Sequence, residues 1–110
     1  MTKRDSITFT IGEAGAALAK AGGEFTTLFS QGTLEIEIYR PVGVDLQKPH
    51  NKDELYVVIN GTGIFAHGQE RTPVHEGDAL FVRAGVPHRF EDFSADFATW
   101  VFFYGPEGGE

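Results

Sequence analysis

Glu54-Leu-Tyr-Val-Val-Ile-Asn-Gly61 is the stretch of the chain with the clearest structural signal. β-Branched and aromatic residues dominate it, and the turn residues Asn60 and Gly61 end it, so it predicts a β-strand. Glu54 shares one face of that strand with Tyr56 and Val58, and the opposite face is also apolar. A strand with two apolar faces is covered on both sides. A carboxylate at the start of such a strand needs a partner.

The segments around this strand predict further short strands. Residues 34–38 alternate apolar and acidic side chains, which indicates a strand with one buried face and a solvated face that carries Glu35 and Glu37. Residues 79–82 and 98–104 are apolar runs that follow turns or loops. Short strands at this spacing, separated by glycine-bearing turns, are typical of an all-β sandwich or barrel.

One segment predicts a helix. Residues 12–21 are rich in alanine, and Gly22 and Gly23 follow where a C-terminal cap would lie. We therefore expect an all-β fold with one short N-terminal helix.

Composition limits the class of protein. The 110 residues suffice for one domain. The 16 acidic and 9 basic residues give a net charge of −7, which argues against nucleic acid or a membrane surface as a partner. The absence of cysteine excludes disulfides, thiolate metal sites and a cysteine nucleophile. Residues 1–5 begin basic, but no apolar segment of a signal peptide follows, so we expect a cytoplasmic protein.

Three polar residues suggest a metal site inside the barrel. His50 lies four residues before Glu54, and His88 follows the corner Gly85-Val-Pro87. Two imidazoles and one carboxylate on one face suit Fe(II), Mn(II), Ni(II) or Zn(II), and they leave coordination positions open. The alternative is a structural or surface role for each histidine.

The chain resembles the cupin superfamily, specifically its small single-domain bacterial members. The first cupin motif ends in His, Glu and Gly at the spacing of His50, Glu54 and Gly61. The glycines and the histidine of the second motif match Gly77, Gly85 and His88. The resemblance covers about residues 33–104. It implies a double-stranded β-helix, or jelly roll, in a single cupin domain of residues 1–110, with an N-terminal strand and helix within residues 7–30.

Three positions depart from the family pattern. Lys48 replaces the first histidine, Arg83 replaces a proline and Asp92 replaces an asparagine. The resemblance therefore implies a divalent metal ion held by only three protein ligands, His50, Glu54 and His88, with Gln47 as a possible fourth.

The roles of the neighbouring polar residues stay open from the sequence. Lys48 either holds or deprotonates a substrate or lies in a solvated loop, and solvation is the commoner state of lysine. Gln47 either ligates the metal or hydrogen-bonds a ligand. Tyr56 either donates a hydrogen bond to substrate or packs with a satisfied hydroxyl. Lys48 and Tyr56 are the candidate catalytic residues. His67 and His75 match no motif position, and we expect both at the surface.

The aromatic residues near the C-terminus predict both a pocket wall and a partner. We expect a core and an aromatic pocket wall from a set of six residues: Phe90, Phe93, Phe97, Trp100, Phe102 and Tyr104. Both faces of the strand at 98–104 are apolar, so a second sheet, the helix or another subunit must cover the outer one. Because small cupins are commonly dimers, we expect a homodimer.

Three functions fit these observations. The first is a metal-dependent oxygenase, isomerase or lyase that acts on a small polar organic molecule. The second is a small-molecule binding or sensing module without catalysis. The third, a purely structural β domain, leaves the positions of His50, Glu54 and His88 unexplained.

Overall fold

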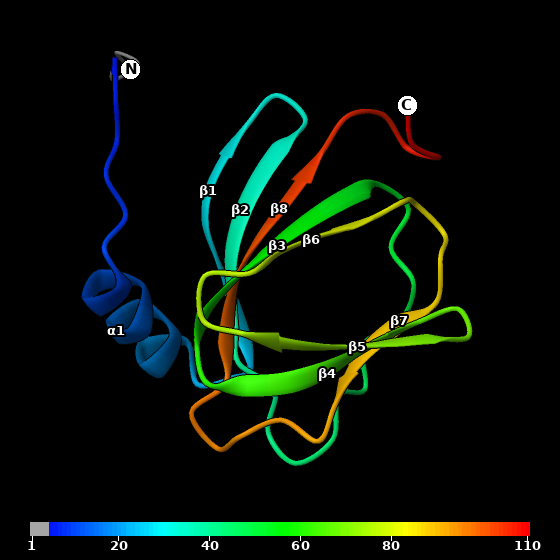
Figure 1. Cartoon of the computed structure of the whole chain (residues 1–110). Helices are drawn as coiled ribbons and strands as arrows, with labels where there is room; N and C mark the ends of the chain where they lie inside the picture. Colours follow the sequence, from blue (N-terminus) through cyan, green and yellow to red (C-terminus); the bar gives the residue numbers. More distant parts are fainter. Residues whose placement is uncertain (1–4) are drawn as a thin grey trace.

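The computed structural model describes residues 5–110 of the chain, and the basic start at residues 1–4 lies outside them. The described residues form one helix and eight strands in two facing sheets (Figure 1). In chain order the elements are α1 (Ile11–Ala21), β1 (Phe25–Gln31), β2 (Leu34–Tyr39), β3 (Asp53–Asn60), β4 (Thr62–His67), β5 (Glu70–His75), β6 (Ala79–Val82), β7 (His88–Glu91) and β8 (Ala98–Tyr104).

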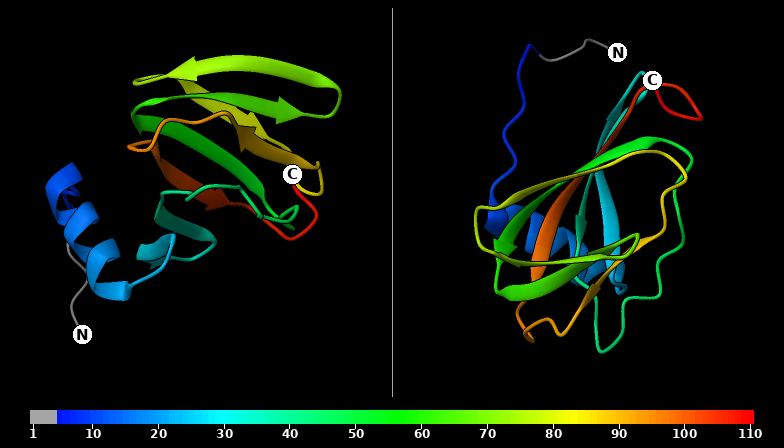
Figure 2. Two further views of the ribbon diagram at one scale, coloured as in Figure 1. Left: turned by 90° about the horizontal axis from the view of Figure 1, so that it is seen from below. Right: turned by 45° about the vertical axis from the view of Figure 1, so that its right-hand side comes forward.

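The two sheets are antiparallel, and the chain crosses between them repeatedly. The larger sheet has the order β1-β2-β8-β3-β6, and the smaller has the order β5-β4-β7. The connections β3–β4, β5–β6, β6–β7 and β7–β8 each pass from one sheet to the other. This winding produces a double-stranded β-helix, so the expected all-β fold with a short N-terminal helix is confirmed (Figure 2).

Gly61 makes the first of these crossings possible. Its φ of +81° is unfavourable for residues with a side chain. A Cβ atom there would also lie 2.9 Å from the Cα atom of Phe97 and 2.3 Å from Oγ of Ser94. The turn between β3 and β4 therefore requires glycine for both conformation and space.

The core lies between the sheets. Its buried side chains come from both layers and are mainly aromatic or β-branched: Tyr56, Val58, Phe65, Val74, Val82, Phe90, Phe97, Val101 and Phe103. Alternation along β3 and β8 places Tyr56, Val58, Val101 and Phe103 on this inner face. Because Glu54 precedes Tyr56 by two residues on β3, its carboxylate also enters the barrel.

A second cluster lies outside the barrel, beneath α1. Ile38 of β2 is 4% exposed and packs with Ala14 and Leu18 of the helix. The apolar face of β2 is thus the outer face, and Glu35 and Glu37 line the internal pocket. Both glutamates are partly exposed, as expected for a solvated face, but that face lines the pocket and is not the outside of the barrel. Alternation separates the two faces of a strand but does not say which one a helix will cover.

Candidate metal centre

The structure brings together the three residues that the sequence singled out. Glu54 is the second residue of β3, His88 is the first residue of β7, and His50 lies in the loop before β3. One ligand atom from each side chain lies within 4.8 Å of the other two. The set combines two nitrogen donors and one carboxylate, contributed from both sheets.

The three side chains differ in burial. Those of Glu54 and His88 are each 1% exposed, whereas that of His50 is 38% exposed. Nε2 of His88 lies 2.9 Å from Oε1 of Glu54, and Nε2 of His50 lies 3.9 Å from Oε2 of the same carboxylate. The centre therefore has two buried donors and a third at its open side.

A backbone contact orients His88. Its Nδ1–H donates to the carbonyl oxygen of Val86 at 2.7 Å. In the neutral imidazole this bond leaves Nε2 with a lone pair that faces Glu54. Histidines that bind metals commonly donate their second ring nitrogen to a carbonyl in this way.

Glu54 lacks a conventional partner. Among residues 5–110, neither of its buried carboxylate oxygens accepts a hydrogen bond from a fixed donor. A buried carboxylate is costly without compensation. A proton on His88, or a cation between His88 and Glu54, would compensate the charge of this carboxylate. Burial alone would lower the pKa of His88, but hydrogen bonds with Glu54 and Val86 and the charges of Glu54 and Asp45 raise it.

The loops that carry the two histidines are joined by their backbones. The N–H of Gly85 donates to the carbonyl oxygen of His50 at 2.7 Å. The φ of +81° at Gly85 forms the corner that leads to His88. The ring of Phe103 lies 4.6 Å from the imidazole of His50, measured between centroids. These contacts position His50 although its side chain is partly open to solvent.

Gln47 lies within a hydrogen-bond chain. Its Oε1 accepts from the hydroxyl of Tyr56 at 2.8 Å, and its Nε2 donates to Oδ2 of Asp45 at 2.6 Å. The same Tyr56 hydroxyl lies 3.0 Å from Nε2 of His88. Gln47 thus supports Tyr56, and its amide oxygen is already engaged.

Asp45 is a buried acceptor of several hydrogen bonds, and the sequence did not indicate this role. It is 4% exposed and accepts hydrogen bonds from the hydroxyl of Tyr39, from the Gln47 side chain and from the backbone N–H of Gln47 and Phe90. Phe90 belongs to β7, so this carboxylate ties the loop before β3 to the smaller sheet. An aspartate in a glycine-containing loop is ordinary, and no local pattern marks it as buried.

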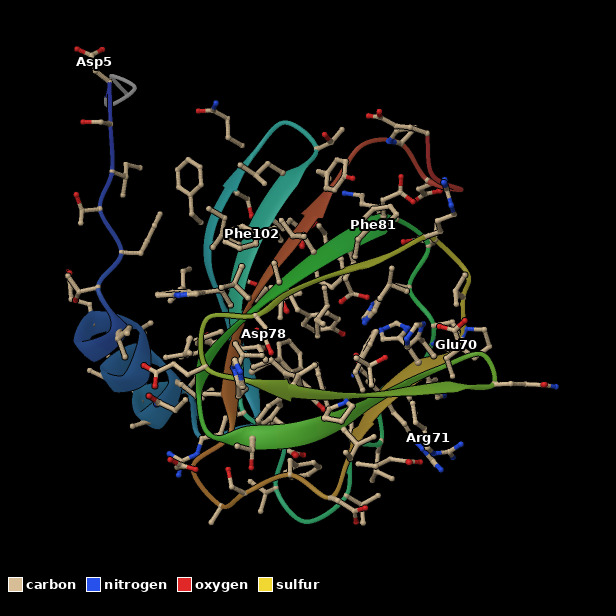
Figure 3. The ribbon with its side chains drawn as sticks, viewed as in Figure 1. Asp5, Glu70, Arg71, Asp78, Phe81 and Phe102 are labelled. Carbon is tan, nitrogen blue, oxygen red and sulfur yellow. The ribbon has the colours of Figure 1, made fainter. Side chains whose placement is uncertain are left out.

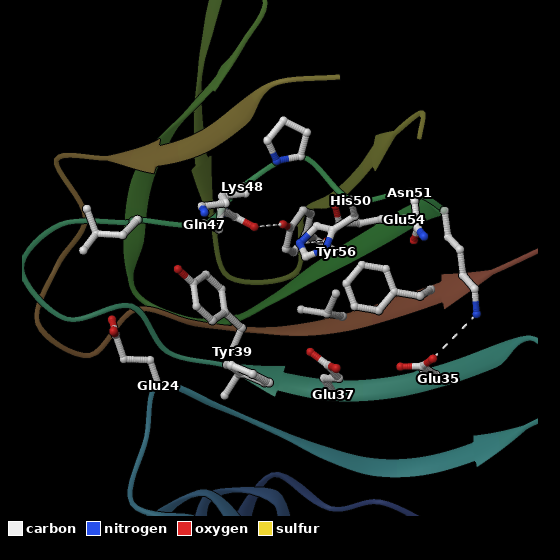
Figure 4. A pocket seen from close by; sticks show the side chains of 16 residues that line it. Glu24, Glu35, Glu37, Tyr39, Gln47, Lys48, His50, Asn51, Glu54 and Tyr56 are labelled. Atoms are coloured by element: carbon white, nitrogen blue, oxygen red, sulfur yellow. Dashed lines mark hydrogen bonds and ion pairs between the residues drawn. The ribbon is translucent and has the colours of Figure 1, made fainter. Parts of the chain in front are cut away.

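A pocket of about 600 Å³ opens beside these residues (Figure 4). Its walls include the carboxylates of Glu24, Glu35, Glu37 and Glu54 together with side chains of the loop before β3. Phe25 and Phe103 are the phenylalanines among its lining residues.

The C-terminal aromatic set contributes to the core as expected, but none of its six members lines the pocket, so the expectation of a pocket wall built from it is wrong. Phe90 and Phe97 lie in the core, with Phe93 packed against them, and Trp100 packs in the cluster beneath α1. Alternation along β8 places Trp100 on the face opposite Val101, outside the barrel. The pocket wall is therefore more acidic than the sequence suggested.

Burial changes the acidity of two groups in the pocket. Desolvation and the charges of Glu35 and Glu54 raise the pKa of Glu37, opposed by a hydrogen bond from Thr27. Desolvation and the charge and hydrogen bonding of Glu54 hold the pKa of Tyr56 well above its ordinary value. The Tyr56 phenol consequently keeps its proton at neutral pH.

The two lysines near the pocket have different surroundings. Lys48 is exposed and lines the mouth, which is compatible with both the solvated and the ligand-binding interpretation. Nζ of Lys52 lies 3.6 Å from Oε1 of Glu35 and donates to the carbonyl oxygen of Thr33 at 3.3 Å. Lys52 therefore compensates the charge of Glu35.

The two remaining histidines are not among the candidate ligands, although His67 is the cross-strand partner of His88 in the pairing of β4 with β7. His75 is exposed, with Nδ1 3.3 Å from Oδ2 of Asp78, as expected for a surface residue. His67 ends β4 and is only half-buried, and its ring stacks on Phe65 with 4.8 Å between centroids. Neither belongs to the group of potential metal ligands found among residues 5–110.

The comparison with known proteins identifies the class. The family model described as the cupin domain matches residues 35–104. The chain belongs to the cupin family, as its two motifs indicated. An uncharacterised protein of Streptomyces coelicolor is 34% identical over 101 residues, covering 90% of this chain and 96% of that protein.

Solved structures support the same fold. A protein of unknown function from Rhizobium leguminosarum matches with a TM-score of 0.68 and 20% identity, over 96% of this chain and 100% of that one. The DMSP lyase DddQ of Ruegeria pomeroyi matches with a TM-score of 0.64 and 22% identity, over 74% of this chain and 46% of the lyase. At these identities the likeness concerns the fold alone. No helix among residues 5–110 has the length and apolar character needed to span a membrane.

Proposed function

We propose that this cupin binds a divalent metal ion through His50, Glu54 and His88 and acts on a small polar organic molecule in the adjacent pocket. The observation that carries the proposal is the 2.9 Å approach of Nε2 of His88 to a buried Glu54 oxygen that has no fixed hydrogen-bond donor. Two lone pairs at this distance repel each other unless a proton or a cation lies between them. The matching cupin motifs favour a metal ion.

The donor set restricts the ion and leaves room for a ligand. Neutral imidazole and carboxylate suit Fe, Mn, Ni or Zn, and three protein ligands leave coordination positions open. A bound ion would supply Lewis acidity or an oxygen-binding centre. Ligand atoms on adjacent positions lie about 3 Å apart, so a small inward movement of the partly exposed His50 would complete the set.

The chain's own residues would orient a bound molecule. Tyr56 presents a protonated phenol beside His88, and Lys48 stands at the mouth. Both are proposed as ligand-binding or catalytic residues of a lyase, isomerase or oxygenase. The likeness to a DMSP lyase is compatible with such chemistry.

Metal quantification tests this proposal. Protein purified without chelators, or reconstituted with each candidate ion, is expected to hold about one ion per chain. His50→Ala, Glu54→Ala and His88→Ala should each weaken binding at least about tenfold, whereas the surface variant His75→Ala should not. Equal metal affinity in wild type and all three ligand variants would refute the site. A metal-loaded protein that binds small molecules without converting them would support the sensing alternative.

We also propose a homodimer formed through the outer face of the larger sheet. The strand register aligns an apolar row there: Phe29, Ile36, Phe102, Leu55 and Phe81, one residue from each strand. Phe102 and Phe81 are labelled in Figure 3. Phe81 at its edge is 48% exposed. A second copy of the chain would cover this row through a two-fold contact, which brings the same patch from each subunit together.

A further inference from the structure

The carboxylates of the pocket are unequally compensated. Glu35 has Lys52 beside it at 3.6 Å. Glu37, two residues further along the same face of β2, accepts only the hydroxyl of Thr27 at 3.2 Å and has no cationic partner among residues 5–110. Figure 4 shows both glutamates on β2 along the pocket wall. Glu37 is therefore an uncompensated acceptor available to a bound molecule.

The proton of Tyr39 is committed away from the pocket. Its hydroxyl donates to Oδ1 of the buried Asp45, which can only accept when ionised. Tyr39 lines the pocket, so the remaining lone pairs of its oxygen are what the hydroxyl can offer a ligand. Burial and the neighbouring carboxylates Asp45, Glu24 and Glu54 raise the pKa of Tyr39, and the phenol remains protonated.

The same aspartate directs the hydroxyl of Tyr56. Because the Gln47 amide must donate to Asp45, its oxygen faces Tyr56 at 2.8 Å. With a metal ion on Nε2 of His88, that nitrogen could no longer accept from Tyr56, and Gln47 would remain as the acceptor. Tyr56 itself is fully buried, so its hydroxyl lies behind the wall of the pocket and supports His88 and Gln47. Asp45 is therefore a positioning residue: it accepts the hydrogen bond of the Tyr39 hydroxyl directly and orients Tyr56 through Gln47.

We propose that the pocket selects a ligand that joins a metal-chelating oxygen group to a protonated amine. The chelating end would occupy the centre formed by His50, Glu54 and His88. The ammonium group would lie against the acceptors Glu37 and Tyr39. The inference rests on the proposed function, because it concerns the same pocket. The buried oxygens of Glu54, which have no hydrogen-bond partner among residues 5–110, point to a bound cation at the end of the pocket that the chelating group would reach.

Three probes of matched length test this selection on the metal-loaded protein. They are 4-aminobutanoate, pentanoate and glutarate, which share a carboxylate and end in a cationic, a neutral or an anionic group. Binding is measured by ligand-observed NMR and calorimetry. We expect 4-aminobutanoate to bind on the order of tenfold more tightly than pentanoate, with glutarate the weakest.

Two variants in the pocket and one remote variant test which residues cause the preference for the amine. Glu37→Gln and Tyr39→Phe keep the size of each side chain and should reduce the preference for the amine severalfold. Glu70→Gln removes the same charge from an exposed position in β5 and should leave the preference unchanged. Metal stoichiometry, measured separately, should stay the same in all three variants.

The outcomes separate the two proposals. Loss of metal binding in the His50, Glu54 and His88 variants together with no preference for the amine would support the proposed function and overturn the inference. If the wild-type protein binds no metal, the proposed function is wrong, and the inference that rests on it is overturned as well. If no probe binds, or if pentanoate or glutarate binds as well as 4-aminobutanoate, the pocket does not select an ammonium group.

Discussion

Nε2 of His88 lies 2.9 Å from Oε1 of Glu54, and Nδ1 of the same ring donates to Val86. The imidazole thus turns its second nitrogen toward a carboxylate that no fixed donor satisfies. A packed protein interior with no binding role would favour an apolar pair or a neutral amide at these two positions. The pair stabilises the fold only with a proton or a cation present, so its effect on stability depends on what it binds.

Glu54→Gln is expected to stabilise the metal-free protein by about 1 kcal/mol, because the new amide N–H can donate to His88 without a buried charge. The same change should abolish the stabilisation produced by added metal. Urea unfolding with and without a chelator measures both effects, with Glu70→Gln as the exposed control. A metal-free Glu54→Gln protein that unfolds more easily than wild type would contradict the interpretation of this pair.

Asp45→Ala is expected to destabilise the protein by about 3 kcal/mol, since it removes the acceptor of several buried donors at once. The N–H of Phe90, which donates to Oδ2 at 2.8 Å, would lose its partner. Urea denaturation should show the loss, and removal of an exposed carboxylate in Glu107→Ala should not. A change as small as that of the control would mean that water replaces Asp45 as the acceptor.

Glu37→Gln should alter the pH dependence of stability. Glu37 in the unfolded chain ionises near pH 4.5, and its pKa is higher in the folded protein. The folded state holds more protons between these two values, so wild-type stability falls as the pH rises through the folded pKa. The glutamine variant lacks this loss. Its stability relative to wild type should therefore increase as the pH rises from about 4.5 through the folded pKa of Glu37.

Thermal unfolding across that pH range provides the measurement. Glu70→Gln serves as a control because its side chain is 79% exposed. A constant difference between Glu37→Gln and wild type at every pH would show that burial of the carboxylate carries no such cost.

The apolar row on the larger sheet leads to a prediction about assembly. Phe102→Ser and Phe81→Ser should shift the protein from dimer to monomer, because each removes an aromatic side chain from the proposed contact. Light scattering after size-exclusion chromatography measures the molecular mass directly. Thr72→Ser, on the exposed strand β5, is the control. Monomeric wild type at every concentration tested would exclude this interface.

Two motif glycines should tolerate alanine to different degrees. Gly77 has a φ of +90° but open space where a Cβ atom would lie, whereas at Gly61 a Cβ atom would lie 2.9 Å from the Phe97 backbone. Gly77→Ala should cost about 1 kcal/mol, from conformation alone. Gly61→Ala should cost a few kcal/mol more, since the backbone of Phe97 cannot move aside easily. Equal losses in urea unfolding would indicate that the β3–β4 turn relaxes freely.

The features of the fold that the sequence predicts are those whose environment is local. The spacing of Gly77, Gly85 and His88 reflects turns within one short segment, and the backbone bond from Gly85 to His50 joins that segment to the first motif. The β-branched run before Gly61 likewise indicates a buried strand by itself. Local spacing of this kind predicts a small β-barrel, and the resemblance to the cupin motifs adds the jelly roll and the grouping of the three side chains; their role as metal ligands stays a prediction.

The features that were missed depend on distant contacts. Asp45 is buried against β7 of the smaller sheet, where the backbone N–H of Phe90 donates to its carboxylate. The periodicity of the sequence does not predict a hydrogen bond between residues this far apart in the chain. Glu37 faces the pocket because α1 covers Ile38 on the opposite side of β2. Tyr39 continues the face of Glu35 and Glu37, so a correct orientation of β2 would have placed it in the pocket as well.

The position of the centre between two sheets that share no strand pairing has a kinetic consequence. β3 supplies Glu54 from the larger sheet, and β7 supplies His88 from the smaller one. An ion bound to both side chains would also be a cross-link between the layers. Its residence time and the rate at which the layers separate would then be coupled, and hydrogen exchange of β7 amides would report the departure of the ion.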